Sequence, residues 1–372
     1  MKSLRRIPIV CVAVGLVFAF SLPAATVGAS EVTPQEKKLI RAAKKEGTVI
    51  SNISLFQDRT VRHLRRELIK RYGLGKNFKY INFRKGTGGS IAMARQEIKA
   101  NKLSFDTFMV PAAGFFYGAA KQGAFLKLDS GQWKNHEELA RKGGQYFEYP
   151  YFVIGSAYTF QPVWNASCPG MKDVKIASYY DIANPKMKGK TIVSDVTKSA
   201  SYSITTIGLM EAGFDVRDMW KKLKATNPLV AFRTEAKMQL LINCERPVDM
   251  WNLTGRVFQA IEKDPSLAKK LRWGTYKEGQ VVMGRQLAVM KGAPHPNAGK
   301  LFVEFLLSKE GVDALVEREV SIISFLKNYV PPASARPYLF DITKVKIIGL
   351  KDWVAGYKKF KKMRTEWLKV FR

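Results

Sequence analysis

Histidine and cysteine are scarce in this 372-residue chain, with three of each. The three histidines lie far apart and have no neighbour at metal-ligand spacing (His63, His136, His295), so the sequence predicts no metal site. The chain also lacks a G-x-S-x-G elbow, a P-loop and an H-E-x-x-H pair. Ser199 does follow Lys198, but side chains adjacent in sequence rarely face each other. We therefore expect neither catalysis nor a cofactor.

Long apolar runs are missing too, except at the N-terminus. Three basic residues precede an uncharged apolar run over 7–20, and small residues then lead to Ala29. This layout is typical of a secretory signal peptide, and the run of 14 residues is shorter than the roughly 20 that span a bilayer. We predict a signal peptide over 1–29, cleaved after Ala29, and delivery to the periplasm. Cys11 lies inside the run behind Val10, which argues against lipid attachment.

Cleavage would leave two cysteines, Cys168 and Cys244. In an oxidising compartment an isolated pair is a disulfide candidate. The alternative is two free thiols too far apart to meet, because sequence does not give the distance between them. Both possibilities remain open at this point.

Acidic residues are half as numerous as basic ones, 31 against 62, which gives a net charge of +31. Such an excess suggests nucleic acid, an anionic membrane surface or an anionic ligand as partner. The basic residues are scattered, however, and no nucleic-acid-reading module is present. We expect a generally basic secreted protein that binds no nucleic acid. A secreted envelope-binding or nucleic-acid-binding protein is the alternative from another functional class.

Strand and helix patterns alternate along the chain. Helical patterns over 34–46 and 59–72 flank a β-branched strand over 48–55. A glycine turn over 86–89 precedes a helix over 90–100. The same alternation continues through the middle of the chain, which predicts an α/β protein with mostly parallel sheets covered by helices.

Six motifs occur in order along the chain. They are Lys-Lys-Glu-Gly at 44–47, a Gly/Ser turn at 86–90, Asp106 at the start of a predicted strand, Gly-Ala-Phe-Leu at 123–126 and two lysine-rich segments at 184–190 and 291–311. In this order they resemble the ferric-iron-type group of bacterial solute-binding proteins. The resemblance covers nearly the whole chain after the signal peptide.

This resemblance implies a two-lobe type II periplasmic binding protein. Each lobe would be a mixed sheet flanked by helices, and two crossing strands would join the lobes. Lobe one would comprise 31–155 plus 291–372, and lobe two would comprise 156–290. The resemblance implies that the protein closes on a small-molecule ligand and delivers it to the permease of an ABC importer, and we expect it to be a monomer.

Candidate ligand-binding residues follow the strands and begin the helices, where backbone N–H groups attract anions. A hydroxyl there could instead only cap its helix, Arg233 could be a surface charge, and Trp251 could be a core aromatic. The candidates are Asn52, Ser54, Thr87, Gly88 and Ser90 in lobe one and Lys198, Ser199, Ala200, Ser201, Arg233, Thr234, Trp251 and Asn252 in lobe two.

The sequence departs from the iron binders at their tyrosine pair. Those proteins carry adjacent tyrosines in a loop of lobe two, where this chain has Met250, Trp251 and Asn252. The pair Tyr179–Tyr180 occurs elsewhere. Phenolate oxygens hold a hard trivalent cation, so we expect an organic or phosphorylated anion, with ferric iron as the alternative.

The last segment, 352–372, is basic and amphipathic. A helix on a membrane surface would fit this pattern. We expect instead a closing helix packed on lobe one, with its lysines in solvent.

Overall fold

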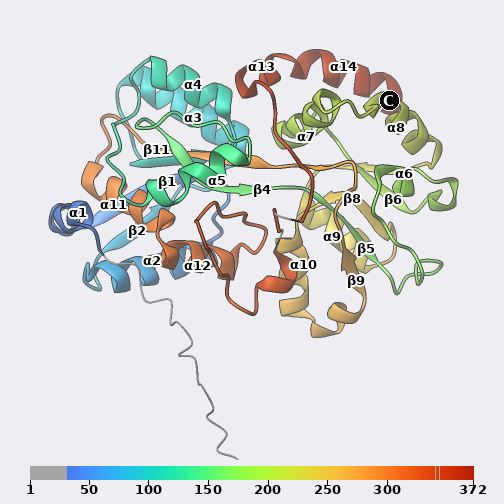
Figure 1. Ribbon diagram of the computed structural model, residues 1–372, viewed down its shortest axis with the longest axis horizontal. Helices are drawn as coiled ribbons and strands as arrows, with labels where there is room; N and C mark the ends of the chain where they lie inside the picture. The colour runs from blue at the N-terminus through green and yellow to red at the C-terminus, as the bar shows by residue number, and fades with distance from the viewer. Residues whose placement is uncertain (1–31, 340, 343) are drawn as a thin grey trace, which may run out of the picture.

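The computed structural model describes residues 32–339, 341–342 and 344–372. The predicted signal peptide lies outside these residues. Figure 1 shows two α/β halves side by side, each built on its own sheet, with long strands running between them. None of the described helices combines the length and apolar character needed to cross a membrane.

The first half is built on a five-stranded mixed sheet. Strands β2, β1 and β3 are parallel, whereas β11 pairs antiparallel with both β3 and β4. The strand order is β2-β1-β3-β11-β4, with β1 over Thr48–Ile53, β2 over Lys79–Asn82, β3 over Thr107–Val110, β4 over Val153–Tyr158 and β11 over Met283–Val289.

Helices cover both faces of this sheet, and the buried apolar side chains beneath them form the core of the first half. They are α1 over Pro34–Glu46, α2 over Asp58–Tyr72, α3 over Thr87–Ala100, α4 over Ala113–Lys121, α5 over Glu137–Lys142, α11 over Pro296–Leu307 and α12 over Lys309–Arg318.

The second half has its own five-stranded mixed sheet. Its order is β7-β6-β8-β5-β9, with β5 over Gln161–Asn165, β6 over Thr191–Ser194, β7 over Leu229–Ala231, β8 over Val248–Asn252 and β9 over Leu271–Trp273. Its helices are α6 over Tyr179–Ile182, α7 over Ala200–Glu211, α8 over Val216–Ala225, α9 over Thr234–Ile242 and α10 over Thr254–Lys263. Short 3-10 helices lie at Trp133–Asn135, Pro185–Met187, Pro265–Lys269 and Arg336–Tyr338.

Two chain segments cross between the halves. One runs from β4 through Thr159 and Phe160 into β5, and the other returns from β10 (Gln280–Val281) into β11. The two segments lie side by side, because Met283 at the start of β11 pairs with Tyr158 at the end of β4. The prediction of two mixed sheets flanked by helices and joined by crossing strands is confirmed.

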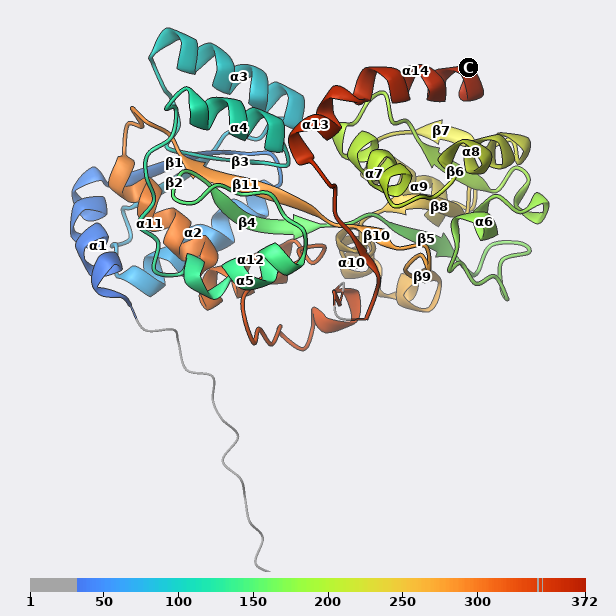
Figure 2. The same ribbon diagram turned by 45° about the horizontal axis from the view of Figure 1, so that its top comes forward.

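The C-terminal segment bridges the halves instead of closing the first one. Strand β12 (Ile347–Ile348) pairs with β10, helix α13 (Trp353–Lys358) lies between α4 and α7, and α14 (Phe360–Phe371) packs on α7 and α8 (Figure 2). The predicted packing of this segment on lobe one is therefore wrong for α14. The reason is that Met363, Trp367 and Phe371 form an apolar stripe that is buried in the core of the second half.

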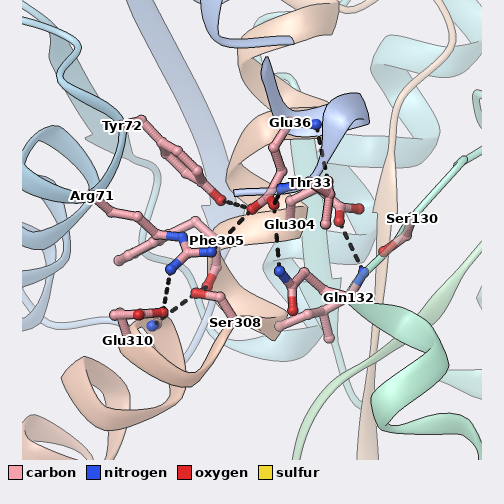
Figure 3. A network of polar contacts seen from close by, with 12 residues as sticks. Thr33, Glu36, Arg71, Tyr72, Ser130, Gln132, Glu304, Phe305, Ser308 and Glu310 are labelled. Atoms are coloured by element: carbon pink, nitrogen blue, oxygen red, sulfur yellow. Dashed lines mark hydrogen bonds and ion pairs between the residues drawn. The ribbon is translucent and has the colours of Figure 1, made fainter. Parts of the chain in front are cut away.

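A buried polar network fixes helix α1 in the first half (Figure 3). Glu36 is fully buried and pairs with Arg71 of α2 at 3.3 Å, while Tyr72 donates a hydrogen bond to the same carboxylate. Gln132 donates to Glu36 through its side chain and to Glu304 of α11 through its backbone N–H at 3.1 Å. The network thus ties α1, α2 and α11 together.

Candidate functional site

A cavity of about 240 Å³ lies between the two halves. The first half contributes side chains from the ends of β1, β2 and β3, the crossing strands contribute three, and the second half contributes the ends of β6, β7 and β8. The lining residues are Ser54, Leu55, Arg84, Thr87, Pro111, Tyr158, Phe160, Ser199, Ser201, Tyr202, Phe232, Arg233, Thr234, Glu235, Leu253, Arg256 and Arg285. This is the edge at which open α/β sheets bind ligands, where the carboxyl ends of the strands meet.

Four helices begin at the wall of this cavity. The first-turn residues Thr87 of α3, Ser201 of α7 and Thr234 of α9 line it, as does Leu253, which precedes α10. Helices α3, α9 and α10 have no side-chain cap on their first N–H groups. Free N–H groups and the positive end of the helix dipole favour negative charge, so the helix starts suit an anion.

Arg285 of β11 is the most deeply placed cation of the cavity wall, only 4% exposed. Its guanidinium lies 3.9 Å from the centre of the Tyr158 ring and donates hydrogen bonds to Ser156 Oγ at 3.3 Å and Ala157 O at 3.5 Å. Within the described residues, no carboxylate lies within 4.0 Å of it. Burial lowers its pKa to about 10, which still leaves it charged at neutral pH. The buried Glu319 carboxylate acts on Arg285 from beyond ion-pair distance and raises the pKa that burial lowers. The direct hydrogen bonds of the guanidinium are neutral and long, so an anion in the cavity would offset part of the cost of burying its charge.

Three further arginines line the cavity, accompanied by one carboxylate. Arg256 pairs with Glu235 at 2.8 Å. Burial would raise the pKa of the Glu235 carboxyl, but Arg256, helped by Arg84 from the opposite half, lowers it below its ordinary value. Arg233 completes the set. The positive charge of the lining therefore exceeds what Glu235 can balance.

Six of the thirteen predicted site residues line the cavity, and they come from both halves: Ser54, Thr87, Ser199, Ser201, Arg233 and Thr234. Ser199 also caps its helix, because its hydroxyl accepts a hydrogen bond from Tyr202 N at 3.4 Å. The capping role and the cavity position coexist at this residue. Ligand contact by these six side chains remains a prediction.

The other seven predicted residues do not line it. Gly88 and Lys198 are exposed outside it, and Ala200 is half-buried. Asn52 and Ser90 are fully buried, and Asn52 donates a hydrogen bond to Ser90 O at 3.5 Å. The glycine turn expected over 86–89 is also wrong, because α3 already begins at Thr87 with Gly86 as its N-cap.

Trp251 and Asn252 belong to the core of the second half. Trp251 is 1% exposed and donates to the Tyr179 hydroxyl at 3.0 Å. Asn252 donates to Asp249 Oδ2 at 2.8 Å. The strand β8 continues to Asn252, so both side chains pack within the sheet and the cavity begins one residue later, at Leu253.

Sequence reasoning missed most of the charged and aromatic lining. Arg84 lies two residues after the end of β2, and its place after a predicted strand could have identified it. Arg256 lies in the first turn of α10, which is a comparable signal. Tyr158, Phe160 and Arg285 lie on the crossing segments, where an apolar strand pattern gives no sign that a side chain faces a ligand.

The tyrosines do not form the arrangement of an iron site. Tyr179 is buried against Tyr276 with ring centres 3.7 Å apart, and Tyr180 is exposed on the surface. Two other tyrosines, Tyr158 and Tyr202, line the cavity, but burial raises the pKa of both, and their hydroxyls bond to Ser201 Oγ and Phe232 O. The described residues also contain no group of three or more His, Cys, Asp or Glu side chains able to hold a metal ion.

Cys168 and Cys244 form a disulfide, with Cα atoms 5.5 Å apart. This resolves the alternative that the sequence left open. The bridge lies in the second half, where Cys168 is part of the core. Neither cysteine lines the cavity.

Comparison with solved structures identifies the same architecture. Iron-bound HitA from Pseudomonas aeruginosa is 14% identical with a TM-score of 0.65, over 87% of this chain and 99% of that one. AfuA from Actinobacillus pleuropneumoniae, solved with fructose-6-phosphate, is 17% identical with a TM-score of 0.66, over 87% and 98%. A substrate-binding protein of an ABC transporter from Agrobacterium tumefaciens is 15% identical with a TM-score of 0.68, over 87% and 95%.

At these identities the likeness establishes the fold and not the ligand. No curated protein matches the sequence. The family model for bacterial extracellular solute-binding proteins matches residues 67–338, which is well over half of the chain. This match shows that the chain belongs to the bacterial extracellular solute-binding proteins.

Proposed function

We propose that this protein is the periplasmic binding component of an ABC importer and that it captures a small anionic solute. In this proposal a cleaved signal peptide exports the chain, and the mature protein acts as a monomer without enzymatic activity. Closure of the first half on the second, whose core includes α14, traps the ligand. The closed form then delivers the ligand to a membrane permease.

The observation that carries the anionic class is Arg285. It is a buried cation on the cavity wall, and no described carboxylate lies within ion-pair distance. The uncapped N-termini of α3, α9 and α10 around the same cavity also favour a bound anion. An organic acid or a phosphorylated compound, such as the sugar phosphate bound to AfuA, would place a negative charge within ion-pair distance of Arg285.

A thermal-shift screen of the mature protein tests this proposal. The screen covers carboxylates, phosphate esters, phosphonates, polyamines, thiamine and ferric salts. A ligand at 100 times its dissociation constant stabilises the native state by about 2.7 kcal/mol, which gives a clear shift. We expect anions to raise the melting temperature and the cationic compounds to leave it unchanged.

Two cavity variants make the test specific. Arg285→Gln and Arg84→Gln should each weaken binding of the best anion by at least about tenfold, since a charge-assisted hydrogen bond contributes roughly 1.5–3 kcal/mol. The control is Arg141→Gln, which removes an exposed arginine that pairs with Glu137 on α5. Unchanged affinity in both cavity variants, or stabilisation by polyamines alone, would refute the anionic assignment.

Ferric iron and nucleic acid remain the alternatives from the sequence. A visible tyrosinate–iron absorption band on adding ferric salt would support the first. Affinity that falls steeply with salt, without saturation by any small molecule, would support the second.

A further inference from the structure

Phe232 presents an exposed aromatic ring to the cavity. It follows strand β7, and 43% of its surface is exposed. None of the other exposed large apolar side chains among the described residues lines this cavity. An exposed ring at a binding site is apolar surface that a ligand can cover, with a gain in free energy that follows the area removed from water.

The backbone that carries this ring is held against a packed aromatic wall. Its carbonyl oxygen accepts a hydrogen bond from the Tyr202 hydroxyl at 3.1 Å. The Tyr202 ring in turn packs against Phe160 at 4.6 Å and stacks on Trp251 at 5.8 Å between centroids. Phe160 and Tyr202 also line the cavity, so Phe232 extends an existing apolar surface.

Two of the four cavity arginines lie against rings. The Arg285 guanidinium lies 3.9 Å from the Tyr158 centroid, and the Arg233 guanidinium lies 5.6 Å from that of Phe232. A guanidinium whose face rests on a ring keeps the N–H groups of its edge for a carboxylate or phosphate. The cavity wall therefore offers guanidinium groups that can bind an anion next to aromatic rings that can contact the rest of the ligand.

The size of the cavity suits a small ligand. Its volume of about 240 Å³ is below the ~300–1,000 Å³ of sites for drug-sized molecules, and one ring with its anionic group is a guest of this scale.

We infer that the ligand is a small anion built on one aromatic ring, and that Phe232 is the specificity-determining side chain that stacks on this ring. This inference rests on the proposed function, because it requires the cavity to bind an anion.

Matched pairs of probes test the ring separately from the charge. Calorimetry on the full mature protein compares phenyl phosphate with methyl phosphate and benzoate with acetate. We expect the aromatic member of at least one pair to bind about tenfold more tightly, as stacking on a ring predicts. Phe232→Ala should remove this preference and leave the affinity for the methyl member nearly unchanged, and Phe232→Trp should retain it.

Leu229→Ala is the matched control, because Leu229 lies on β7, the strand that Phe232 follows, is 37% exposed and does not line the cavity. It should bind like the wild type. Equal affinities within both pairs, tighter binding of glucose 6-phosphate than of phenyl phosphate, or a ring preference that survives Phe232→Ala would overturn the inference while leaving an anion-binding protein in place. Failure of every anion to bind would instead refute the proposed function, and the ring assignment with it.

Discussion

At the scale of single residues, the second half depends on a buried ion pair beneath the cavity. Lys237 and Asp249 are both 0% exposed and lie 3.0 Å apart. The Lys237 ammonium also donates to Ser194 Oγ at 2.8 Å and to Trp251 O at 2.5 Å, so all three of its hydrogen-bonding positions are used. A buried charge is tolerated in this way because each partner satisfies the other.

Lys237→Met should therefore destabilise the protein by about 3–5 kcal/mol, because it leaves the Asp249 carboxylate buried without a counter-charge. Urea unfolding followed by fluorescence measures the loss. The double variant Lys237→Met/Asp249→Leu removes both charges and should recover most of the stability. If the single and double variants were equally unstable, packing and not charge would be the cause.

At the scale of elements, the network in Figure 3 makes the attachment of α1 and α11 sensitive to pH. Burial raises the pKa of Glu304 on α11 to about 7. The native state thus holds a proton more tightly than the unfolded chain, in which this carboxyl has its ordinary pKa of 4.5. Its contribution to stability is complete below pH 4.5 and is lost as pH rises to about 7.

Glu304→Gln, which keeps the shape without the ionisation, should remove this part of the pH dependence. Between these pKa values the wild type should lose up to about 1.4 kcal/mol per pH unit relative to the variant. Melting temperatures of both proteins from pH 4 to pH 8.5 provide the measurement. Parallel curves would show that Glu304 does not titrate in this range. Glu137→Gln, on the exposed surface of α5, is the control.

At the scale of the whole molecule, an ion pair joins the two halves outside the cavity. Arg59 of α2 lies 3.0 Å from Glu262 of α10. An exposed pair of this kind contributes at most about 1 kcal/mol. Because the pair bridges the two halves, we predict that it favours the closed state and raises the apparent ligand affinity.

Glu262→Lys should replace this attraction by repulsion and weaken anion binding several-fold, with faster ligand dissociation in stopped-flow experiments. The control is Glu245→Lys, which makes the same charge change on an exposed position of the second half away from the cavity. Since added positive charge by itself attracts anions, a loss confined to Glu262→Lys would identify closure as the cause. Equal effects in both variants would contradict this.

Local sequence patterns predicted several of the residues that line the cavity, but not Arg285 or Phe232. Ser54, Thr87 and Thr234 were found because they follow strands or begin helices, and those positions depend on neighbours in the chain. Arg285 and Phe232 were missed because their role depends on their position at the cavity wall, which no local pattern shows. The cavity exists only after segments far apart in sequence have come together.

The sequence alone determined the α/β class, the two sheets with crossing strands and the family, because periodicity, turn residues and motif order are local and survive without coordinates. The tertiary structure decided which hydroxyls and arginines share a cavity, that Cys168 meets Cys244, and that α14 covers the second half. These depend on distances between residues remote in the chain, and such distances are set by packing of the whole molecule.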